Sequence, residues 1–178
     1  GAFCSALLDW GDARGFGFSA VASLGAAADV DFGEVLDYLA LDAHTRSILL
    51  YIEGVSNARA FLSGLRAAAR LKPVIVVKAG RSERGIRAVT SHTGARTGGD
   101  LVFDAAIKRA GAVRVGTVSQ WFDTAQTLAS GTRVEGARLA ILTNGGGPGV
   151  MAADRAADVQ VQLADLSEQS VARLGAAL

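Results

Sequence analysis

The sequence predicts an α/β fold in which a parallel sheet is covered by helices on both faces. Two observations lead to this prediction. Short apolar runs alternate with segments of helical periodicity along most of the chain, and the runs show little polar alternation, as expected for strands covered on both sides. Strands that alternate with helices pair in parallel through right-handed crossovers. We therefore expect a flavodoxin-like or Rossmann-like doubly wound sheet.

Five segments carry the aliphatic or β-branched runs that are typical of strands. In chain order they are Phe18 to Ser23, Ser47 to Ile52, Val74 to Lys78, Ala112 to Val115 and Leu139 to Thr143. Helical spacing predicts an amphipathic start over 1–10 and then helices at Phe32 to Leu41, Asn57 to Leu71, Asp100 to Ala110 and Ser119 to Ser130. The connection after Lys78 is expected to be long and to contain a loop from Ser91 to Ala95.

A polar, glycine-bearing stretch over 131–137 gives the best domain boundary. The pattern then restarts with a strand at 138–143, a helix at 148–158, a strand at 160–164 and a helix at 167–177. We expect a first domain over 1–132 and a partial second, similar domain over 137–178. The chain starts without methionine and both ends fall inside helical patterns, so we expect it to be a piece of a longer polypeptide.

Composition excludes several classes of protein. The net charge of +1, with no concentrated basic stripe, argues against nucleic acid as the main partner. Cys4 is the only cysteine, so the sequence offers neither a disulfide framework nor a cysteine-based metal site, and we expect no bound metal. No apolar run reaches the roughly 18 residues of a membrane span, and no secretory signal is visible. We expect a soluble cytoplasmic protein.

The tetrapeptide from Ser91 to Gly94 contains one of only two histidines, His92, in a stretch of small residues. There an imidazole can meet a phosphate, with Ser91 and Thr93 beside it. The other histidine, His44, lies in a polar turn and is expected to have no chemical role. A histidine flanked by serine, threonine and glycine is weak evidence by itself.

A second motif, from Asn144 to Gly149, strengthens this interpretation because it follows a predicted strand and leads into a predicted helix. Glycines let backbone N–H groups turn toward an anion, and the first helical turn supplies unpaired donors and a positive dipole end. The alternative is a tight strand-to-helix turn that needs positive φ. The spacing matches neither a Walker sequence nor a dinucleotide fingerprint.

Glu53 directly follows an apolar run, so it is expected at the carboxyl edge of the sheet, where ligands gather. It can be a solvated strand-end carboxylate. Beside an imidazole it would instead accept one ring N–H and leave the other nitrogen free to attack phosphorus. Arg81, Arg84 and Arg87 are interpreted as a solvated basic face.

With these residues in view, the chain resembles the nucleoside-diphosphate-forming acyl-CoA synthetase superfamily, which includes succinyl-CoA synthetase and ADP-forming acetyl-CoA synthetases. The likeness runs in unbroken order over nearly the whole chain. It covers Leu7 to Trp10, Gly15 to Ser19, Ser23 to Asp31, Ile48 to Gly54, Lys72 to Arg81, Ser91 to Ala95, Asp104 to Gly111 and Leu142 to Ala152.

The resemblance implies a ligase in which His92 is phosphorylated during turnover and Glu53 holds it. Helix N-termini at two sites would bind the phosphate. We expect the phosphate-binding set to comprise Ser91, Thr93, Gly94, Asn144, Gly145, Gly146 and Gly147.

The same resemblance implies the cofactors and partners. CoA and ATP or ADP would be bound mainly by domains outside this chain, a CoA-binding domain and an ATP-grasp domain or subunit, with Mg²⁺ accompanying the nucleotide. The substrates would be a small acid, its CoA thioester and phosphate, and an oligomer is expected. An alternative is an acyl-CoA-sensing regulatory region fused to a GNAT protein lysine acetyltransferase.

Overall fold

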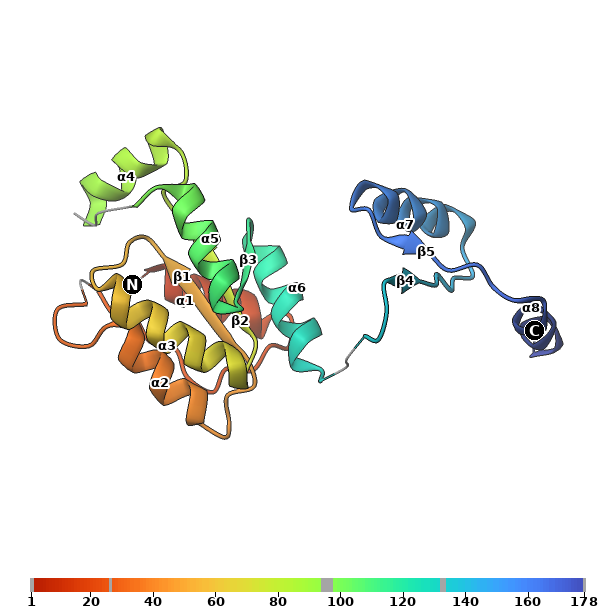
Figure 1. Cartoon of the computed structure of the whole chain (residues 1–178), viewed down its shortest axis with the longest axis horizontal. Helices are drawn as coiled ribbons and strands as arrows, with labels where there is room; N and C mark the ends of the chain where they lie inside the picture. Colours follow the sequence, from red (N-terminus) through yellow and green to blue (C-terminus); the bar gives the residue numbers. More distant parts are fainter. Residues whose placement is uncertain (1, 26, 94–97, 132–133, 178) are drawn as a thin grey trace. The chain divides into compact units, whose positions relative to one another are not determined.

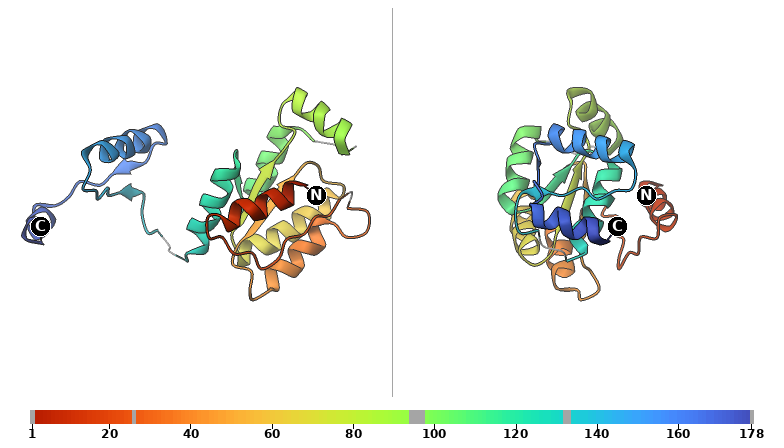
Figure 2. Two further views of the ribbon diagram at one scale, coloured as in Figure 1. Left: turned by 180° about the vertical axis from the view of Figure 1, so that it is seen from behind. Right: turned by 90° about the vertical axis from the view of Figure 1, so that its right-hand side faces the viewer.

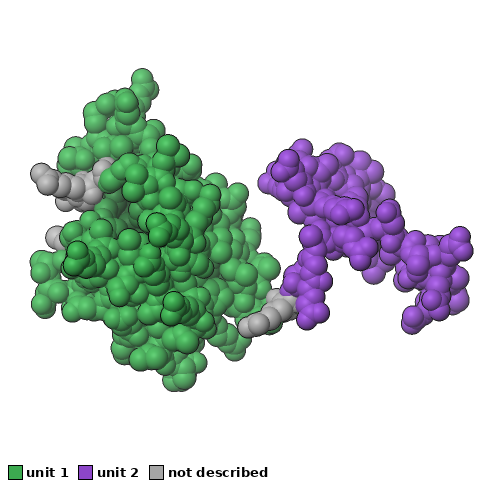
Figure 3. Space-filling view, in the orientation of Figure 1, with its two compact units in different colours: residues 1–132 green, residues 133–178 purple. Residues whose placement is uncertain are grey.

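The structure, a computed structural model, describes residues 2–25, 27–93, 98–131 and 134–177; the side chains of Ala2, His92 and Thr93 also lie outside the described part. The chain divides into two compact units, Gly1–Thr132 (unit 1) and Arg133–Leu178 (unit 2) (Figure 3).

Unit 1 is built around a parallel sheet of three strands in the order β1-β2-β3 (Figure 1). The strands are β1 (Ile48–Ile52), β2 (Val74–Lys78) and β3 (Val113–Val115). Their register pairs Ile48 with Val74 and Ile75 with Val113, so all three carboxyl ends lie at one edge of the sheet. This edge is where ligands of open α/β sheets are bound.

Helices cover both faces of this sheet (Figures 1 and 2). The helices α2 (Phe32–Leu41), α3 (Ala58–Leu71) and α5 (Asp100–Ala110) pack on one face, and α1 (Ala2–Asp12) and α6 (Val118–Ala129) pack on the other. Strand residues alternate between the two: Val74 and Val76 join the first core, whereas Ile75 and Val77 join the second. The predicted α/β class with a flavodoxin-like parallel sheet is confirmed.

Local chemistry explains where these helices begin and end. Asp31 caps α2 by accepting hydrogen bonds from the backbone N–H groups of Gly33 and Glu34, and the Glu34 side chain accepts from the Asp31 N–H, which is a complete capping box. Asn57 caps α3 through a single hydrogen bond, which its side-chain oxygen accepts from the Ala60 N–H. Gly111 ends α5 in the left-handed conformation, at φ 85°.

The predicted strand Phe18 to Ser23 is wrong. This segment has no strand pairing among the described residues and is largely exposed. It is anchored instead by side chains, since the Phe18 ring meets Phe122 edge-on and Ser19 shares a hydrogen bond with Thr45. Aliphatic composition alone does not make a strand, because a strand also needs to pair with a sheet.

The long connection after Lys78 contains a helix that was not predicted from the sequence, α4 (Glu83–Thr93). Ser82 starts this helix: its hydroxyl accepts a hydrogen bond from the Gly85 N–H, and its carbonyl accepts from the Ile86 N–H. The arginines of this stretch were interpreted as a solvated basic face, so its helical spacing was not recognised. Both ribbon views show α4 standing out from the rest of unit 1 (Figures 1 and 2).

Unit 2 is a small β-α-β element followed by a further helix. The strands β4 (Arg138–Leu139) and β5 (Gln162–Leu163) pair in parallel, with α7 (Gly146–Asp158) between them and α8 (Glu168–Ala177) after them. The predicted strands 138–143 and 160–164 are thus reduced to two residues each. Leu142 remains 89% exposed, since no described layer covers it.

No described helix is long and apolar enough to span a bilayer.

Candidate functional site

Polar side chains collect at the carboxyl edge of the unit 1 sheet, where β1, β2 and β3 end. Glu53 follows β1, Lys78 is the last residue of β2, and Gly116 follows β3. A Cβ added to Gly116 would lie 3.7 Å from Arg81 Nη1, so Arg81 reaches across from the end of β2 to the end of β3. The structure therefore brings several charged groups to the edge that the sequence predicts for ligand binding.

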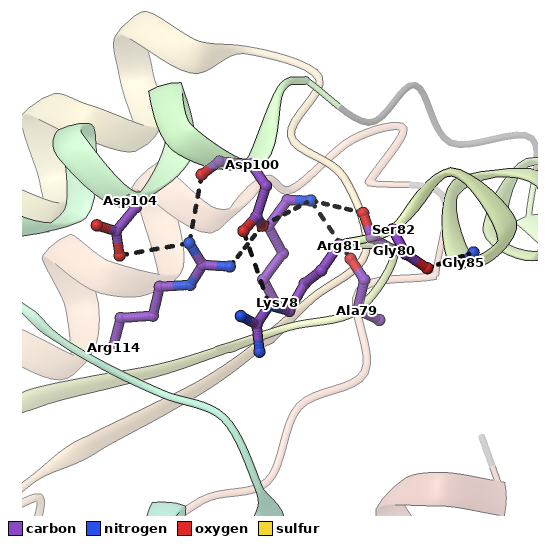
Figure 4. Close-up of polar contacts among 9 residues, drawn as sticks. All are labelled: Lys78, Ala79, Gly80, Arg81, Ser82, Gly85, Asp100, Asp104 and Arg114. Atoms are coloured by element: carbon purple, nitrogen blue, oxygen red, sulfur yellow. Dashed lines mark hydrogen bonds and ion pairs between the residues drawn. The ribbon is translucent and has the colours of Figure 1, made fainter.

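Lys78 is the most unusual of these groups, because its side chain is only 2% exposed. Its Nζ donates to the carbonyl of Gly80 at 3.0 Å and to that of Ala79 at 3.5 Å, and lies 3.8 Å from Oδ1 of Asp100 (Figure 4). A buried cation needs such partners to offset its lost hydration.

Asp100 connects three cations at the start of α5 (Figure 4). Its Oδ1 accepts from Arg114 Nη2 at 2.5 Å, and its Oδ2 lies 3.7 Å from Arg81 Nε. Arg114 comes from β3, is only 9% exposed, and also reaches Asp104 Oδ1 at 3.4 Å and the Asp100 carbonyl at 3.3 Å. The Phe103 ring lies near both buried cations, 5.5 Å from Lys78 Nζ and 5.4 Å from Arg114 Cζ.

The protonation equilibria follow from these contacts. Burial lowers the pKa of Lys78, although the charge of Asp100 opposes this shift. Burial raises the pKa of Asp100, but the hydrogen bond and charge of Arg114, together with Lys78 and Arg81, outweigh burial and leave the pKa below its ordinary value. Asp100 is therefore an anion at neutral pH and balances one of the cations around it.

An open hollow of about 530 Å³ lies beside this cluster. It is lined by Lys78, Gly80, Arg81, Ser82, Gly85 and Asp100. The hollow therefore joins the end of β2 to the first turn of α4 and the first residue of α5.

Glu53 has a neighbour that the sequence did not reveal. Burial raises the pKa of Tyr51, and the charge of Glu53 and a hydrogen bond to it raise the pKa further. The protonated Tyr51 hydroxyl thus donates to Glu53. The Glu53 carboxylate keeps further acceptor positions for a second donor, which an imidazole N–H can fill.

The motif around His92 lies in the last turn of α4 and not in a loop, as far as it is described. Ser91 belongs to α4 and donates from its hydroxyl to the Ala88 carbonyl at 2.9 Å. His92 and Thr93 are helical, while their side chains lie outside the described part, as does all of Gly94. The pairing of His92 with Glu53 therefore stays a prediction.

The glycine motif lies in unit 2 at the start of α7. Gly145 is the N-cap, and its N–H donates to Thr143 Oγ1 at 3.0 Å. The first helical bond runs from the Gly149 N–H to the Gly145 carbonyl, and Pro148 has no N–H. The N–H groups of Gly146 and Gly147 lie in the first turn, before helical bonding begins. Asn144 precedes them and is exposed.

The backbone angles bear on the two interpretations of this motif, an anion-binding helix start and a tight turn that needs positive φ. None of the glycines from 145 to 149 has positive φ, so the turn itself does not require glycine for that reason. A Cβ on Gly149 would lie 3.0 Å from Thr143 Cγ2, which explains that glycine by close packing. At Gly146 and Gly147 a Cβ would meet no described atom within 4 Å. These two glycines leave open space over the helix start.

Within the described residues, no group of three or more histidine, cysteine, aspartate or glutamate side chains is placed to hold a metal ion.

The cluster of Lys78, Asp100 and Arg114 was missed in the sequence. The signal that could have found it is the lysine that ends a fully buried apolar strand, Val74 to Lys78. Such a lysine requires a carboxylate partner, and Asp100, the next carboxylate at the start of a predicted helix, was available. Arg81, interpreted as part of a solvated basic face, is exposed for 57% of its side chain yet pairs with Asp100.

Comparison with known proteins identifies the family. Residues 1–128 match the family of the succinyl-CoA ligase like flavodoxin domain, and the chain belongs to this family. The resemblance noted in the sequence is thereby confirmed.

Three relatives show how far the similarity extends. Subunit alpha of the ADP-forming acetate–CoA ligase I of Pyrococcus furiosus is 43% identical over 95% of this chain and 37% of its own length. The ADP-forming acetate–CoA ligase I of Archaeoglobus fulgidus is 42% identical over 98% of this chain and 25% of its own length. The structure of Ca. Korarchaeum cryptofilum acetyl-coenzyme A synthetase 1 in complex with phosphate and ADP matches with a TM-score of 0.86 and 36% identity, over 94% of this chain and 37% of that one.

The chain thus spans between a quarter and two fifths of the length of these relatives. All three are named as acetate–CoA ligases or acetyl-CoA synthetases, and none as an acetyltransferase. The comparisons give the acetyltransferase-linked alternative no support.

Proposed function

We propose that this chain is the phosphohistidine-bearing part of an ADP-forming acyl-CoA ligase. The observation that carries the proposal is the extent of the similarity: at 43% identity, the Pyrococcus furiosus relative aligns over 169 of 178 residues. An alignment of that length includes both the α4 segment with His92 and the glycine start of α7. The known names of these relatives favour ADP as the nucleotide.

The proposed reaction has three steps. Phosphate displaces CoA from an acyl-CoA and gives an acyl phosphate. His92 then attacks the phosphorus of the acyl phosphate, so that the free acid leaves and a phosphohistidine remains. The phosphohistidine finally transfers its phosphoryl group to ADP and gives ATP. Read backwards, the same steps make acyl-CoA from acid, CoA and ATP.

The residues of this chain would serve these steps by positioning and by neutralising charge, which is most of what phosphoryl transfer requires. Glu53 would accept the N–H of one His92 ring nitrogen and leave the lone pair of the other nitrogen free for attack. Ser91, Thr93 and Gly94 flank His92 and are proposed to contact the phosphoryl oxygens.

The start of α7 is proposed to bind the phosphate. The free N–H groups of Gly146 and Gly147 and the positive end of the helix dipole favour an anion there, and the absence of side chains lets it approach. Gly145 and Asn144 complete this proposed set. The Korarchaeum cryptofilum structure, solved with phosphate and ADP, supports these ligands for the family.

The remaining components are proposed from the relatives and the resemblance. CoA and the nucleotide with its Mg²⁺ would be bound by a CoA-binding domain and an ATP-grasp domain or subunit beyond these residues. The Pyrococcus furiosus relative is named as one subunit, which agrees with an assembly of more than one chain. A cytoplasmic location fits these substrates.

The test of this function uses both histidines of the chain in the complete enzyme. With γ-labelled ATP, the wild type should acquire an acid-labile, base-stable phosphate, and His92→Ala should acquire none and lose turnover. His44→Ala is the matched control, because His44 is 89% exposed and its ring pairs with Asp42, at 3.4 Å, away from the proposed site residues. Unchanged labelling and turnover in His92→Ala would refute the proposal.

Glu53→Gln sharpens the same test. The amide is close in size to the carboxylate but neutral, so the phosphohistidine should form at a rate reduced about 10²-fold, as expected when a group that orients a catalytic side chain is lost. An unchanged rate of labelling would show that Glu53 does not orient His92 and that Glu53 is a solvated strand-end carboxylate.

A further inference from the structure

His92 lies on an excursion of the chain that leaves the sheet at Lys78 and returns to the core at Asp100. The excursion contains α4, which both ribbon views show projecting from the remainder of unit 1 (Figures 1 and 2). The orientation of α4 depends on its two attachment points and on the packing of Val89, which is buried. The polar cluster around Lys78 joins these two points to each other and to β3 (Figure 4).

At the departing end, Lys78 fixes the turn on which α4 is seated. Gly80 is in the left-handed conformation, at φ 67°, and its carbonyl accepts the 3.0 Å hydrogen bond from Lys78 Nζ. The first turn of α4 packs directly on this turn: a Cβ on Gly85 would lie 3.3 Å from Gly80 Cα and 3.3 Å from Ser82 Oγ. The position of the Lys78 ammonium is thus transmitted through Gly80 to α4.

At the returning end, Asp100 is fastened from two strands. Arg114 of β3 binds its carboxylate at 2.5 Å and its carbonyl at 3.3 Å, and Lys78 of β2 lies 3.8 Å from the same carboxylate. Arg81, within the excursion, approaches the other carboxylate oxygen at 3.7 Å. One carboxylate thereby connects the start of the excursion, its end and the sheet.

The burial of Lys78 and Arg114 argues that this cluster does more than stabilise the fold. Burying an ion pair costs so much hydration that apolar residues of similar size often give equal or greater stability. A cluster of two buried cations is therefore poor evidence for a purely structural role. Such a cluster does fix the directions and distances between the groups that it joins.

We propose that Lys78, Asp100 and Arg114 form a clamp that fixes both ends of the excursion carrying His92, with Lys78 as a positioning residue for phosphoryl transfer. The role in transfer rests on the function proposed above, while the clamp itself is a property of this fold. Lys78 touches no reacting atom in this proposal; it acts through Gly80, Gly85 and α4.

The geometry makes the effect on His92 large. His92 is seven residues beyond Gly85, which at about 1.5 Å per residue places it ~10 Å along α4. A tilt of ~6° at the seat of the helix moves the far end by ~1 Å, and a misplacement of ~1 Å can reduce a reaction rate about 10²-fold.

The experiment compares Lys78→Met with Lys72→Met in the complete enzyme. Lys72 lies just before the other end of β2, where its Nζ donates to the carbonyls of Leu39 and Asp42, so it is also a half-buried lysine that bonds backbone carbonyls. We expect Lys78→Met to lower the rate of phosphohistidine formation and kcat about 10²-fold, with KM values within threefold. Lys72→Met should leave kcat within twofold.

Hydrogen exchange supplies a readout that does not depend on activity. Amide exchange across α4 should accelerate at least tenfold in Lys78→Met, with the rates in α3 unchanged, and α4 should be unaffected in Lys72→Met. Asp100→Asn is the second variant: its side chain is 27% exposed and the amide keeps the size of the carboxylate, and it should accelerate α4 exchange and lower kcat about tenfold.

Each outcome decides one of the two proposals. Unchanged α4 exchange in both Lys78→Met and Asp100→Asn overturns the clamp, and equal kcat losses in Lys78→Met and Lys72→Met overturn the positioning role. If His92→Ala still acquires label and turns over, the proposed function is wrong, yet α4 exchange still decides the clamp.

Discussion

Units 1 and 2 are both built from β-α-β elements, but among the described residues unit 1 has an extensive core and unit 2 has little. Its sheet is covered on both faces, and residues such as Leu36, Ile52, Leu65 and Ile75 are fully buried. In the described part of unit 2, Ala156 is the only buried residue of the two helices, while Val150 and Met151 of α7 are exposed. Similar local patterns therefore give an independent domain in one case and an element that lacks a covering layer in the other.

This difference separates two kinds of site. The Lys78 cluster of unit 1 is complete within its own unit, because a packed sheet holds each of its members. The glycine start of α7 presents free N–H groups on a unit with little packing of its own. Sites held by packed elements are positioned more precisely than sites on elements with little packing.

The largest expected effect comes from separating the two units. Residues 1–132 expressed alone should unfold cooperatively with heat, because the unit contains both core clusters. Residues 133–178 alone should show no cooperative transition by circular dichroism. A cooperative transition in the shorter piece would show that unit 2 has a stable core of its own.

The next prediction compares one apolar truncation in each unit. Leu65→Ala, at a side chain that is fully buried between α3 and the sheet, should reduce the free energy of unfolding by about 2–5 kcal/mol. Met151→Ala, at a side chain 74% exposed on α7, should change it by less than about 0.5 kcal/mol. Both are measured by denaturant unfolding of the 178-residue chain. A large loss for Met151→Ala would show that unit 2 packs against another surface.

A third prediction tests what the glycines of unit 2 are for. Gly147→Ala has room for its methyl group and negative φ, so it should leave thermal stability unchanged or slightly higher. In the complete enzyme it should raise the KM for phosphate about tenfold, because the methyl group lies where the anion is proposed to approach.

Gly149→Ala is the control for that prediction. Its methyl group would lie 3.0 Å from Thr143 Cγ2, so it should lower stability. An unchanged KM for phosphate in Gly147→Ala would show that the motif is a simple strand-to-helix turn and not a phosphate site.

The smallest expected effect concerns acid. The pKa of Asp104 is lowered chiefly by its hydrogen bond to Lys108, and that of Asp100 by Arg114 against the opposing effect of burial. As the pH falls, these two carboxylates therefore become protonated in the unfolded chain at a higher pH than in the folded chain. The stabilisation is complete above about pH 4 and is lost as the pH drops through the folded pKa values.

Asp100→Asn should accordingly flatten the loss of stability below about pH 4. Asp158→Asn in unit 2 should not, because its pair with Arg155 is 3.8 Å long and exposed on both sides. Thermal unfolding of the 178-residue chain between about pH 3 and pH 6 measures both. Identical profiles for wild type and Asp100→Asn would show that the cluster is not held by charge.

Much of the fold was predictable because its signals are local. The helix from Asp100 to Ala110 and the strand from Val74 to Lys78 were predicted to the residue, since a carboxylate in the first turn, a glycine stop and an unbroken apolar run do not depend on distant contacts. The segment from Phe18 to Ser23 failed because strand formation needs a partner edge, which composition does not reveal.

The candidate site was predictable only in its separate parts. Glu53 and the glycine motif follow apolar runs, and period and position place them at strand ends. The pairing of Lys78 with Asp100 joins side chains 22 positions apart in the sequence, and the pairing of Arg114 with Asp100 joins side chains 14 positions apart. Such pairs leave no periodic trace in the sequence.

The sequence by itself determined the class of fold, most helix boundaries, the family and the residues to test, because these follow from local spacing and from motifs in unbroken order. Tertiary structure alone decided that the segment before His92 is a helix seated on Gly80. It also decided that two cations are buried around Asp100 and that unit 2 has little core. These features arise when strands from distant parts of the chain share one sheet edge, where burial changes the free energy of every charge they bring together.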